Sequence, residues 1–427
     1  MPNLISLLGI FVLMGLGLAV SNNRRRVRWR TVIWGVGLQF GFALILLRTP
    51  WGTAIFDAAR VTINRVLGFT DAGASFLFGN LFRGNADVVQ YLEPGAEGGF
   101  IQFTNSATGE LAPLGMIFAI HVLPTVIFFA SLMAVLYHLG VMQRVIAGIS
   151  WVMRRTMRTS GSETLSVAAD IFVGQTEAPV VIRPYIKTMT NSELMAVMTA
   201  GFATIAGGVM AAYVRLGIDA GHLLAASIMS APAALVMAKI MFPETEQSDT
   251  EGGIKVDIPR EYSGLIDAAA GGASVGLKLA ANIGAMLLAF VALVAMVDAG
   301  LGLAGLSLSQ IFGWVFAPLA WTLGVPWSEA STFGNLLGTK ISVNEFLGYI
   351  QLDQAIRDGT LSPRSVVIAT YALCGFANFS SIAIQIGGYG ILAPERRSDV
   401  ARLGLRAMFA GTFANLMTAA IAGILTT

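Results

Sequence analysis

Cysteine, histidine and charged residues are all scarce in this 427-residue chain. The single cysteine, Cys374, excludes an internal disulfide and a metal site built from several thiolates. The three histidines are dispersed, and the sequence has no HExxH motif, which argues against a zinc-dependent protease acting within a membrane. A net charge of only +2 argues against a nucleic-acid partner.

Charged residues make up 12% of the chain, about half the fraction typical of a soluble domain. Apolar runs of about 20 residues recur along the chain, the length that crosses a bilayer as a helix. The sequence therefore predicts an all-α integral membrane protein with eight transmembrane helices. Their approximate ranges are 3–21, 31–48, 113–139, 193–215, 220–242, 274–299, 364–392 and 399–426.

Basic residues in short loops predict the orientation of these spans. Arginine clusters follow the first and third spans and separate the last two, so all three are expected on the cytoplasmic side, with both termini outside. We interpret residues 1–20 as a retained first span rather than a secretory signal, because a basic n-region is lacking. The clusters comprise Arg24, Arg25, Arg26, Arg28 and Arg30; Arg144, Arg154, Arg155 and Arg158; and Arg396, Arg397 and Arg402.

Two further segments are too polar to be simple spans. Residues 54–67 alternate apolar and polar side chains at helical spacing, which indicates either an interfacial helix or an ordinary solvated one. Residues 243–263 are acidic, polar and interrupted by Pro and Gly, so they indicate a cytoplasmic linker.

The two halves on either side of the linker resemble each other. Each has a polar, Gly-marked segment, 174–179 or 338–345, followed about 25 to 30 residues later by a similar tetrapeptide, 201–204 or 375–378. Paired interrupted segments of this kind indicate a transporter built from repeats. The orientation predicts that the segments near 161–190 and 327–352 are re-entrant helical hairpins entering from opposite faces, so the repeat is inverted.

Ionisable side chains within a membrane are costly and usually face a cavity or a partner. Glu177 and Glu345 are each predicted at a hairpin tip, where their carboxylates could bind a neutral, hydroxyl-rich solute. Gln175 and Thr176 add the donors and acceptors that match a nucleobase edge. Structural alternatives remain open: Glu177 could pair with Arg183 or Lys187, and Glu345 with Lys340.

Two more sets of polar residues are candidates. Asn378, Ser380 and Ser381 follow Gly375 and Ala377, where we expect an unwound segment to free backbone groups; a helix–helix hydrogen bond is the alternative for Asn378. Asp170 could meet Thr204 and free carbonyls near Val173 and Ile205, oxygen ligands suited to Na⁺. It could equally take a proton, or be a helix N-terminal acid.

The segments around Gly174–Pro179, Gly338–Phe346 and Cys374–Ser381 resemble the signatures of the concentrative nucleoside transporters, and the likeness covers nearly the whole chain in order. It implies nucleoside–Na⁺ symport into a bacterial cell across the inner membrane, by a homotrimer whose transport domains move as elevators. Gln175, Thr176 and Glu177 would face the nucleobase, with Val209 and Phe376 as apolar walls. Glu345, Asn378 and Ser381 would bind the ribose. The Na⁺ site would comprise Asp170, Val173, Thr204 and Ile205, although many relatives carry Asn where this chain has Asp170.

The resemblance also divides the chain into domains. Residues 1–150 would supply scaffold spans and the interfacial helix, 151–242 the first transport repeat, 243–263 the linker, 264–310 a scaffold span and 311–427 the second transport repeat. Proton coupling, and a hairpin-type carrier of another polar solute such as a dicarboxylate, are the alternatives. A passive channel is a further one, but it would not explain the hairpins.

Overall fold

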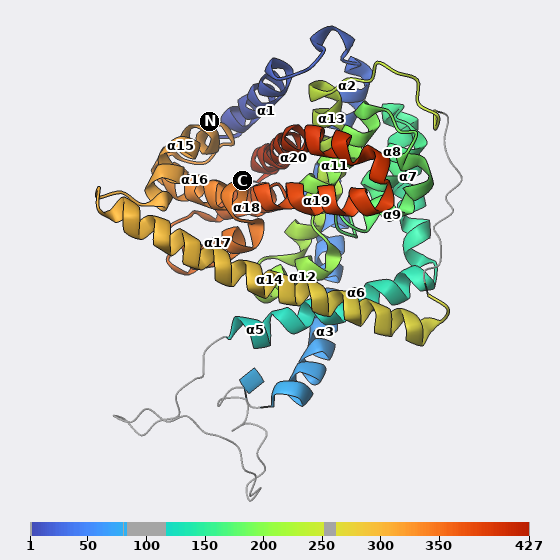
Figure 1. Cartoon of the computed structure of the whole chain (residues 1–427). Coiled ribbons are helices and arrows are strands. Elements are labelled where there is room, and N and C mark those ends of the chain that lie inside the picture. Colours follow the sequence, from blue (N-terminus) through green and yellow to red (C-terminus); the bar gives the residue numbers. More distant parts are fainter. Residues whose placement is uncertain (1, 80, 83–116, 252–261, 427) are drawn as a thin grey trace, which may run out of the picture.

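The computed structural model describes residues 2–79, 81–82, 117–251 and 262–426, and within these ranges it contains helices and no strand (Figure 1). The prediction of an all-α protein is confirmed. The start of the predicted span 113–139 and the middle of the predicted linker 243–263 lie outside the described residues. In chain order the α-helices are α1 (Pro2–Ala19), α2 (Trp29–Arg48), α3 (Pro50–Phe78), α5 (Phe118–His121), α6 (Leu123–His138), α7 (Val141–Met157), α8 (Gly161–Ala169), α9 (Ala178–Val181), α10 (Arg183–Ile186), α11 (Asn191–Ala203), α12 (Gly207–Arg215), α13 (Ala220–Met241), α14 (Leu265–Gly302), α15 (Leu308–Thr322), α16 (Trp327–Ser342), α17 (Glu345–Arg357), α18 (Pro363–Leu373), α19 (Phe379–Leu392) and α20 (Arg397–Leu425).

Length and composition allow six helical stretches among the described residues to cross a membrane. The helices 3–19 and 379–392 are apolar but shorter, so the number of eight crossings stays a prediction. The sequence-based spans omit α15, an apolar helix that meets α16 at an angle of 116°. The six stretches are Trp29–Arg48, Phe118–His138, Asn191–Arg215, Ala220–Met241, Leu265–Gly302 and Pro394–Leu425.

Two of the predicted spans are interrupted. The span predicted at 193–215 divides into α11 and α12, and the span predicted at 364–392 divides into α18 and α19. The interfacial helix expected at 54–67 is part of the longer α3, because the helical pattern continues through Leu67, Thr70 and Ala74, which are buried.

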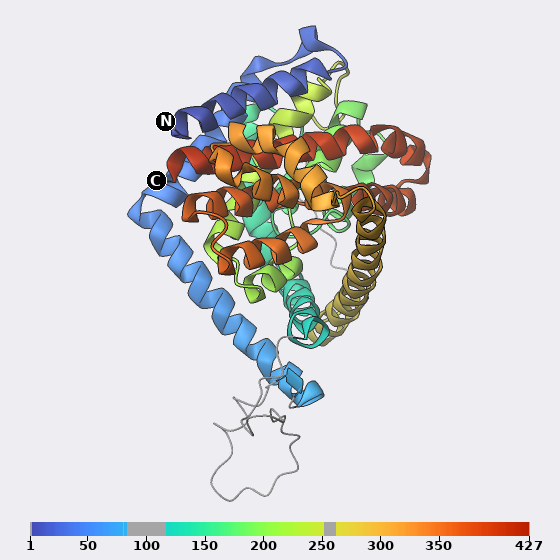
Figure 2. The ribbon, with the colours of Figure 1, turned by 90° about the vertical axis from the view of Figure 1, so that its left-hand side faces the viewer.

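Helices α13 and α20 form the centre of the molecule, and α1, α2, α11 and α18 pack against them (Figures 1 and 2). Gly35 allows α2 to approach closely, since a Cβ atom there would lie 2.3 Å from Val236 Cγ2 on α13. Outside this group, α14 packs along α6, where a Cβ on Gly272 would lie 2.7 Å from the Ala130 carbonyl oxygen. Figure 2 shows α3 as a long rod along the side of the central helices, where it packs on α2 and α13.

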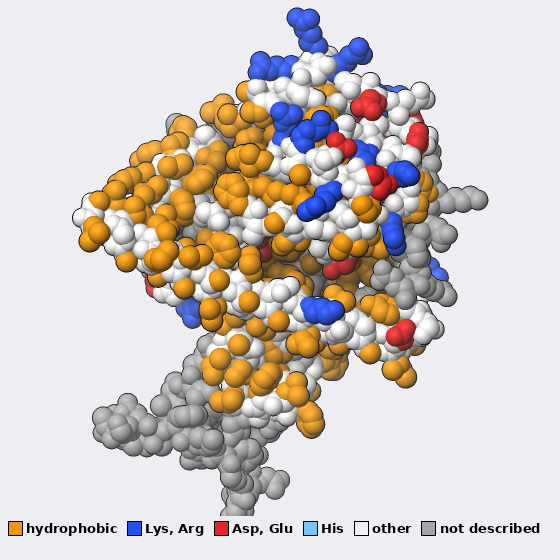
Figure 3. All heavy atoms as spheres, viewed as in Figure 1, with side chains coloured by type: hydrophobic (Ala, Val, Ile, Leu, Met, Phe, Trp, Pro, Cys, Tyr) orange, Lys and Arg blue, Asp and Glu red, His pale blue; other side chains and the backbone are white. Residues whose placement is uncertain are grey.

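Side chains at the surface separate by type (Figure 3). Lys and Arg gather toward the end of the molecule that carries the α1–α2 turn, whereas hydrophobic side chains cover α14 and α15. Exposed apolar residues on these helices include Ile266, Leu288, Met296, Trp314 and Val315. Such a surface suits contact with lipid or with another apolar chain.

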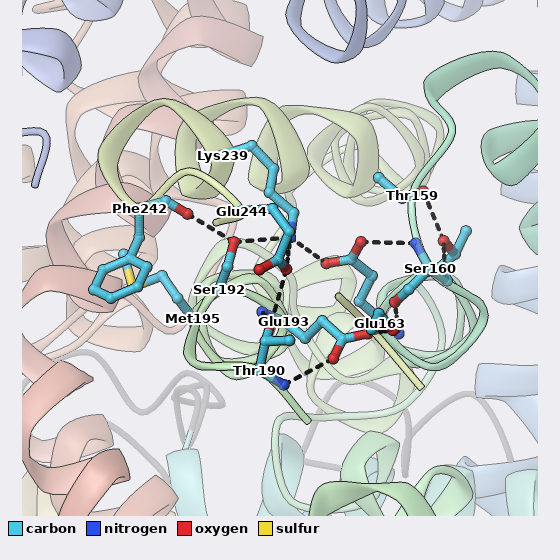
Figure 4. A network of polar contacts seen from close by, with 12 residues as sticks. Thr159, Ser160, Glu163, Thr190, Ser192, Glu193, Met195, Lys239, Phe242 and Glu244 are labelled. Carbon is cyan, nitrogen blue, oxygen red and sulfur yellow. Dashed lines mark hydrogen bonds and ion pairs between the residues drawn. The ribbon is translucent and has the colours of Figure 1, made fainter. Parts of the chain in front are cut away.

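A buried ionic network joins the beginnings of α8 and α11 to the end of α13 (Figure 4). Ser160 with Glu163, and Thr190 with Glu193, form capping boxes that start α8 and α11. Lys239 on α13 lies 2.7 Å from Glu163 Oε2 and donates to Ser192 Oγ at 3.0 Å. The Glu163 carboxylate therefore also links α8 to α13, and Glu193 Oε1 on α11 accepts from the Ser162 hydroxyl on α8 at 3.4 Å.

Replacing Lys239 with Met is expected to lower the free energy of unfolding by about 3–5 kcal/mol, because Glu163 would keep a buried charge without its cation. Thermal unfolding of the purified protein in detergent measures this effect. Lys278→Met is the control, since Lys278 is exposed on α14. Equal melting temperatures for the Lys239 and Lys278 variants would contradict the assignment.

Candidate functional site

The two interrupted spans cross at their breaks, and the lack of a side chain at Gly375 makes the crossing possible. Gly375 has a φ of +134°, and a Cβ atom there would lie 2.7 Å from the Phe202 carbonyl oxygen and 2.6 Å from Asn415 Oδ1. Extended residues thus bring the end of α11 and the start of α19 together in the protein interior. Backbone groups at both breaks are left without helical partners.

Asn415 on α20 stabilises this crossing. Its amide nitrogen donates to the Ala203 carbonyl at 2.6 Å, and its oxygen accepts from Lys340 Nζ at 2.8 Å. Lys340 also donates to the Ala372 carbonyl at 2.8 Å. One amide and one buried ammonium group therefore satisfy carbonyls at the ends of both α11 and α18. Lys340 therefore bonds to Asn415 and the Ala372 carbonyl, rather than to Glu345 as the sequence-based alternative expects.

Gly375→Ala is expected to destabilise the protein by about 2–5 kcal/mol, because the added methyl group meets backbone atoms and the φ value is unfavourable for alanine. Gly387→Ala on α19 is the matched control, since a Cβ there would meet no atom within 4 Å. The two melting temperatures give the comparison. A Gly375 variant as stable as the Gly387 variant would show that the crossing tolerates a side chain.

Glu345 begins α17, directly after the break that follows α16, and the residue is 4% exposed. Oε1 accepts a hydrogen bond from the Tyr213 hydroxyl at 2.8 Å, and Oε2 accepts one from Asn378 Nδ2 at 3.2 Å. A carboxylate can accept about four hydrogen bonds, so these two donors orient Glu345 and leave capacity for a ligand. Tyr213 is on α12, which follows one helix break, and Asn378 is the N-cap of α19 in the other break.

Asn378 is the N-cap of α19, and its oxygen accepts from the Ser381 backbone N–H at 2.9 Å and from the Ser380 hydroxyl at 2.8 Å. The Ser381 hydroxyl in turn accepts from Gln175 Nε2 at 3.1 Å. A chain of hydrogen bonds consequently runs from Glu345 through Asn378 and Ser381 to Gln175. It joins the two polar segments that the sequence places in different halves.

The first segment, between α8 and α9, supplies the remaining predicted contacts. Gln175 is 7% exposed and accepts from Gln385 Nε2 at 3.1 Å, whereas Thr176 and Glu177 are exposed. Glu177 Oε2 accepts from the Gly174 N–H at 2.8 Å. A Cβ atom on Gly174 would lie 3.9 Å from Phe376 Cε2, so the predicted apolar wall also reaches this segment. Val209 is buried at the start of α12.

The predicted cation ligands gather around the end of α8. Asp170 is the C-cap of α8 and is 1% exposed, and neither of its carboxylate oxygens has a hydrogen-bond partner among the described residues. The idea that it is a helix N-terminal acid is wrong, because the negative end of the helix dipole lies here and disfavours a carboxylate. An uncompensated buried carboxylate requires a cation or a proton.

Thr204 and Ile205 lie in the break between α11 and α12 and are each 1% exposed. The Gly207 N–H donates to the Phe172 carbonyl at 2.9 Å, which holds this break against the segment that contains Val173. The Thr204 hydroxyl donates to the Ala200 carbonyl at 2.9 Å, so its lone pairs can still accept or coordinate. Hydroxyl, carbonyl and carboxylate oxygens are the ligand types that a hard cation prefers.

Three contributing side chains are missing from the sequence-based set. Tyr213 orients Glu345, Gln385 orients Gln175, and Asn415 supports the crossing. Each is a polar residue within a predicted apolar span, and that property was the available signal.

Comparisons with known families fit this geometry. A model described as the Na⁺ dependent nucleoside transporter N-terminus matches residues 8–81, and one described as nucleoside recognition matches residues 119–219. The model of the Na⁺ dependent nucleoside transporter C-terminus matches residues 222–423. A Haemophilus influenzae protein named "Uncharacterized transporter" is 44% identical over 99% of this chain and 98% of its own length. The chain belongs to the concentrative nucleoside transporter family.

Members of this family are transporters rather than enzymes. Sodium/nucleoside cotransporter 1 of Rattus norvegicus is 42% identical over 99% of this chain, which spans 64% of the length of that relative. The solved structure of CNTnw in an inward-facing substrate-bound state is 42% identical, covers 100% of this chain and 98% of its own, and has a TM-score of 0.89. A CNTnw variant in an outward-facing state gives the same score.

Proposed function

We propose that this chain imports nucleosides by symport with Na⁺, through an elevator-type alternating-access movement. The hydrogen-bonded chain from Glu345 through Asn378 and Ser381 to Gln175 carries this proposal. It unites a carboxylate, two amides and a hydroxyl in a buried place, which is the mixture of donors and acceptors that a ribose and a nucleobase require.

The residue roles follow from this chemistry. Glu345, Asn378 and Ser381 accept from and donate to the ribose hydroxyls, adding a ligand to the hydrogen bonds they make with each other. Gln175, Thr176 and Glu177 meet the polar edge of the base, and Val209 and Phe376 cover its faces. Tyr213 keeps the Glu345 carboxylate in position, because its hydroxyl occupies one carboxylate oxygen.

The coupling cation is proposed to bind Asp170, Thr204 and the carbonyl oxygens of Val173 and Ile205. Within the described part of the chain, both carboxylate oxygens of Asp170 lack a hydrogen-bond partner, which favours such a site. A cation there would hold the α8–α9 segment, which contains Gln175, beside the α11–α12 break, so nucleoside and cation affinities would rise together. A proton on Asp170 is the alternative coupling ion.

Two re-entrant hairpins are proposed, α8 to α10 and α16 to α17, which enter from opposite faces as an inverted repeat. With eight crossings, both termini lie outside and the arginine clusters lie in the cytoplasm, as expected for an inner-membrane protein. The gathering of Lys and Arg toward the α1–α2 turn supports this orientation.

The packing refines the proposed domains. Helices α6 and α14 pack together outside the central group and suit a fixed scaffold, whereas α3 contacts α6 and also α2 and α13. Helices α1 and α2 pack on α13 and α20, so we group them with the moving part rather than with the scaffold expected for residues 1–150. The exposed apolar surface of α14 suits the lipid bilayer and the contacts of a homotrimer.

Uptake of radiolabelled uridine into proteoliposomes tests the function. We expect saturable uptake that requires an inward Na⁺ gradient. Absence of uptake under Na⁺ and H⁺ gradients, together with absence of a uridine-induced rise in melting temperature, would overturn the proposal. Uptake of a dicarboxylate instead of uridine would favour the other carrier class.

A further inference from the structure

A cavity of about 220 Å³ lies between α6, α14 and the α8–α9 segment, beside the proposed nucleoside site. We call it the vestibule. Gly174, Glu177 and Ala206 line one wall, and Tyr137, His138 and Gln143, from the α6–α7 turn, line the opposite wall. Glu177 also belongs to the proposed base-binding set, so the vestibule shares this residue with that site. Arg144 lies in the first turn of α7, which places the α6–α7 turn at the proposed cytoplasmic side.

Three polar atoms on the α6–α7 wall are buried and, among the described residues, have no hydrogen-bond partner. They are Tyr137 Oη, His138 Nδ1 and Gln143 Oε1. The Gln143 amide cannot turn freely, since its Nε2 donates to the Tyr137 carbonyl at 2.7 Å. Its oxygen is consequently fixed as an acceptor, while the Tyr137 hydroxyl is a donor. Buried polar groups without partners are rare and call for an explanation.

The rest of the vestibule is apolar and can cover a flat ring. Met133 from α6, Val180 from α9, and Val275 and Leu279 from α14 line it. The cavity is slightly smaller than the roughly 300–1,000 Å³ typical of drug-sized ligands. Apolar walls with one fixed acceptor and one donor match a nucleobase, whose edge offers both an N–H group and a carbonyl oxygen.

We propose that the vestibule is a second nucleoside-binding position, occupied as the substrate passes between the inner site and the cytoplasm. This inference rests on the proposed function. Tyr137 donates to a base carbonyl, Gln143 accepts from a base N–H, and Met133 and Leu279 cover the ring. The position exists only while Glu177 faces the α6–α7 turn, because α6 and α14 belong to the proposed scaffold and the α8–α9 segment to the moving part.

Equilibrium dialysis of radiolabelled uridine against the purified full chain in Na⁺ buffer tests the inference. We expect two classes of site in the unmodified protein, a tight one and a weak one. Glu345→Ala removes the tight class and keeps the weak one. Adding Tyr137→Phe to Glu345→Ala lowers the uridine affinity of the weak class about threefold to tenfold, the effect of one lost neutral hydrogen bond.

Two further variants separate a binding role from a structural one. Val275→Trp places an indole in the vestibule from a position that is 46% exposed, and it is expected to abolish the weak class while the tight class remains. Tyr185→Phe is the matched control, because Tyr185 on α10 is outside the vestibule lining, and it leaves both classes unchanged.

The outcomes distinguish the two proposals. One class in the unmodified protein and none in Glu345→Ala would overturn the vestibule and leave the inner site standing. A weak class that survives both Tyr137→Phe and Val275→Trp would place the second nucleoside elsewhere and also overturn the inference. No uridine binding by any variant, with no uptake, would instead mean that the proposed function fails.

Discussion

Glu345→Ala is expected to reduce uridine uptake by at least about a hundredfold. The substitution removes the proposed acceptor for the ribose hydroxyls and leaves the Tyr213 hydroxyl and the Asn378 amide without their buried partner. Hydrogen bonds to a charged group contribute about 1.5–3 kcal/mol each, so the loss of two corresponds to a factor of about 10² to 10⁴. Initial rates in proteoliposomes at fixed Na⁺ give the measurement.

Glu345→Gln refines this test, because glutamine keeps the shape and one acceptor oxygen. We expect uptake between that of the unmodified protein and that of Glu345→Ala. Glu395→Gln is the matched control, since Glu395 is exposed in the turn between α19 and α20. Melting temperatures show whether the Glu345 variants are folded. A folded Glu345→Ala variant with more than a tenth of normal uptake would exclude a direct role in binding.

Much of this site can be predicted from residue type and position. Glycines and small polar residues in the middle of apolar runs predict weak points, and the helices do break after Ala203 and after Leu373. The hydrogen-bonded chain from Glu345 to Gln175 agrees with the expectation that the two polar segments meet. Polar side chains within a membrane strongly indicate a functional site, because few structural roles compensate for the free energy needed to insert them.

Other features depend on three-dimensional packing that spacing does not encode. Asn415 and Lys340 contact the Ala203 and Ala372 carbonyls only because two distant breaks cross. The sequence alone does not show whether Asp170 begins or ends a helix, because no capping motif marks the end of α8 at Ala169. The sequence predicts only residues 54–67 of α3, because the part after Leu67 buries few side chains, such as Thr70 and Ala74, and its apolar pattern is weak.

Asp170→Asn is expected to weaken Na⁺ binding about tenfold to a hundredfold, while uptake still depends on Na⁺. The Asp170 carboxylate lies at the negative end of α8, and its oxygens have no hydrogen-bond partner among the residues that the structure describes. A bound cation would therefore offset both the cost of burying the carboxylate and its repulsion by the helix dipole. Removing the negative charge lowers the binding free energy of the cation by about 1.5–3 kcal/mol. The Na⁺ concentration for half-maximal uptake gives the measurement.

Linkage supplies the second part of this prediction. If the cation and the nucleoside stabilise the same arrangement of the α8–α9 segment, the variant also binds uridine more weakly at low Na⁺, and saturating Na⁺ restores the affinity. Asp249→Asn is the control, because Asp249 is exposed in the segment after α13. Proton coupling predicts a different pattern: uptake by the unmodified protein in Na⁺-free vesicles under an inward H⁺ gradient, lost in Asp170→Asn. That pattern would assign the carboxylate to a proton, since an amide cannot carry one to the other side of the membrane.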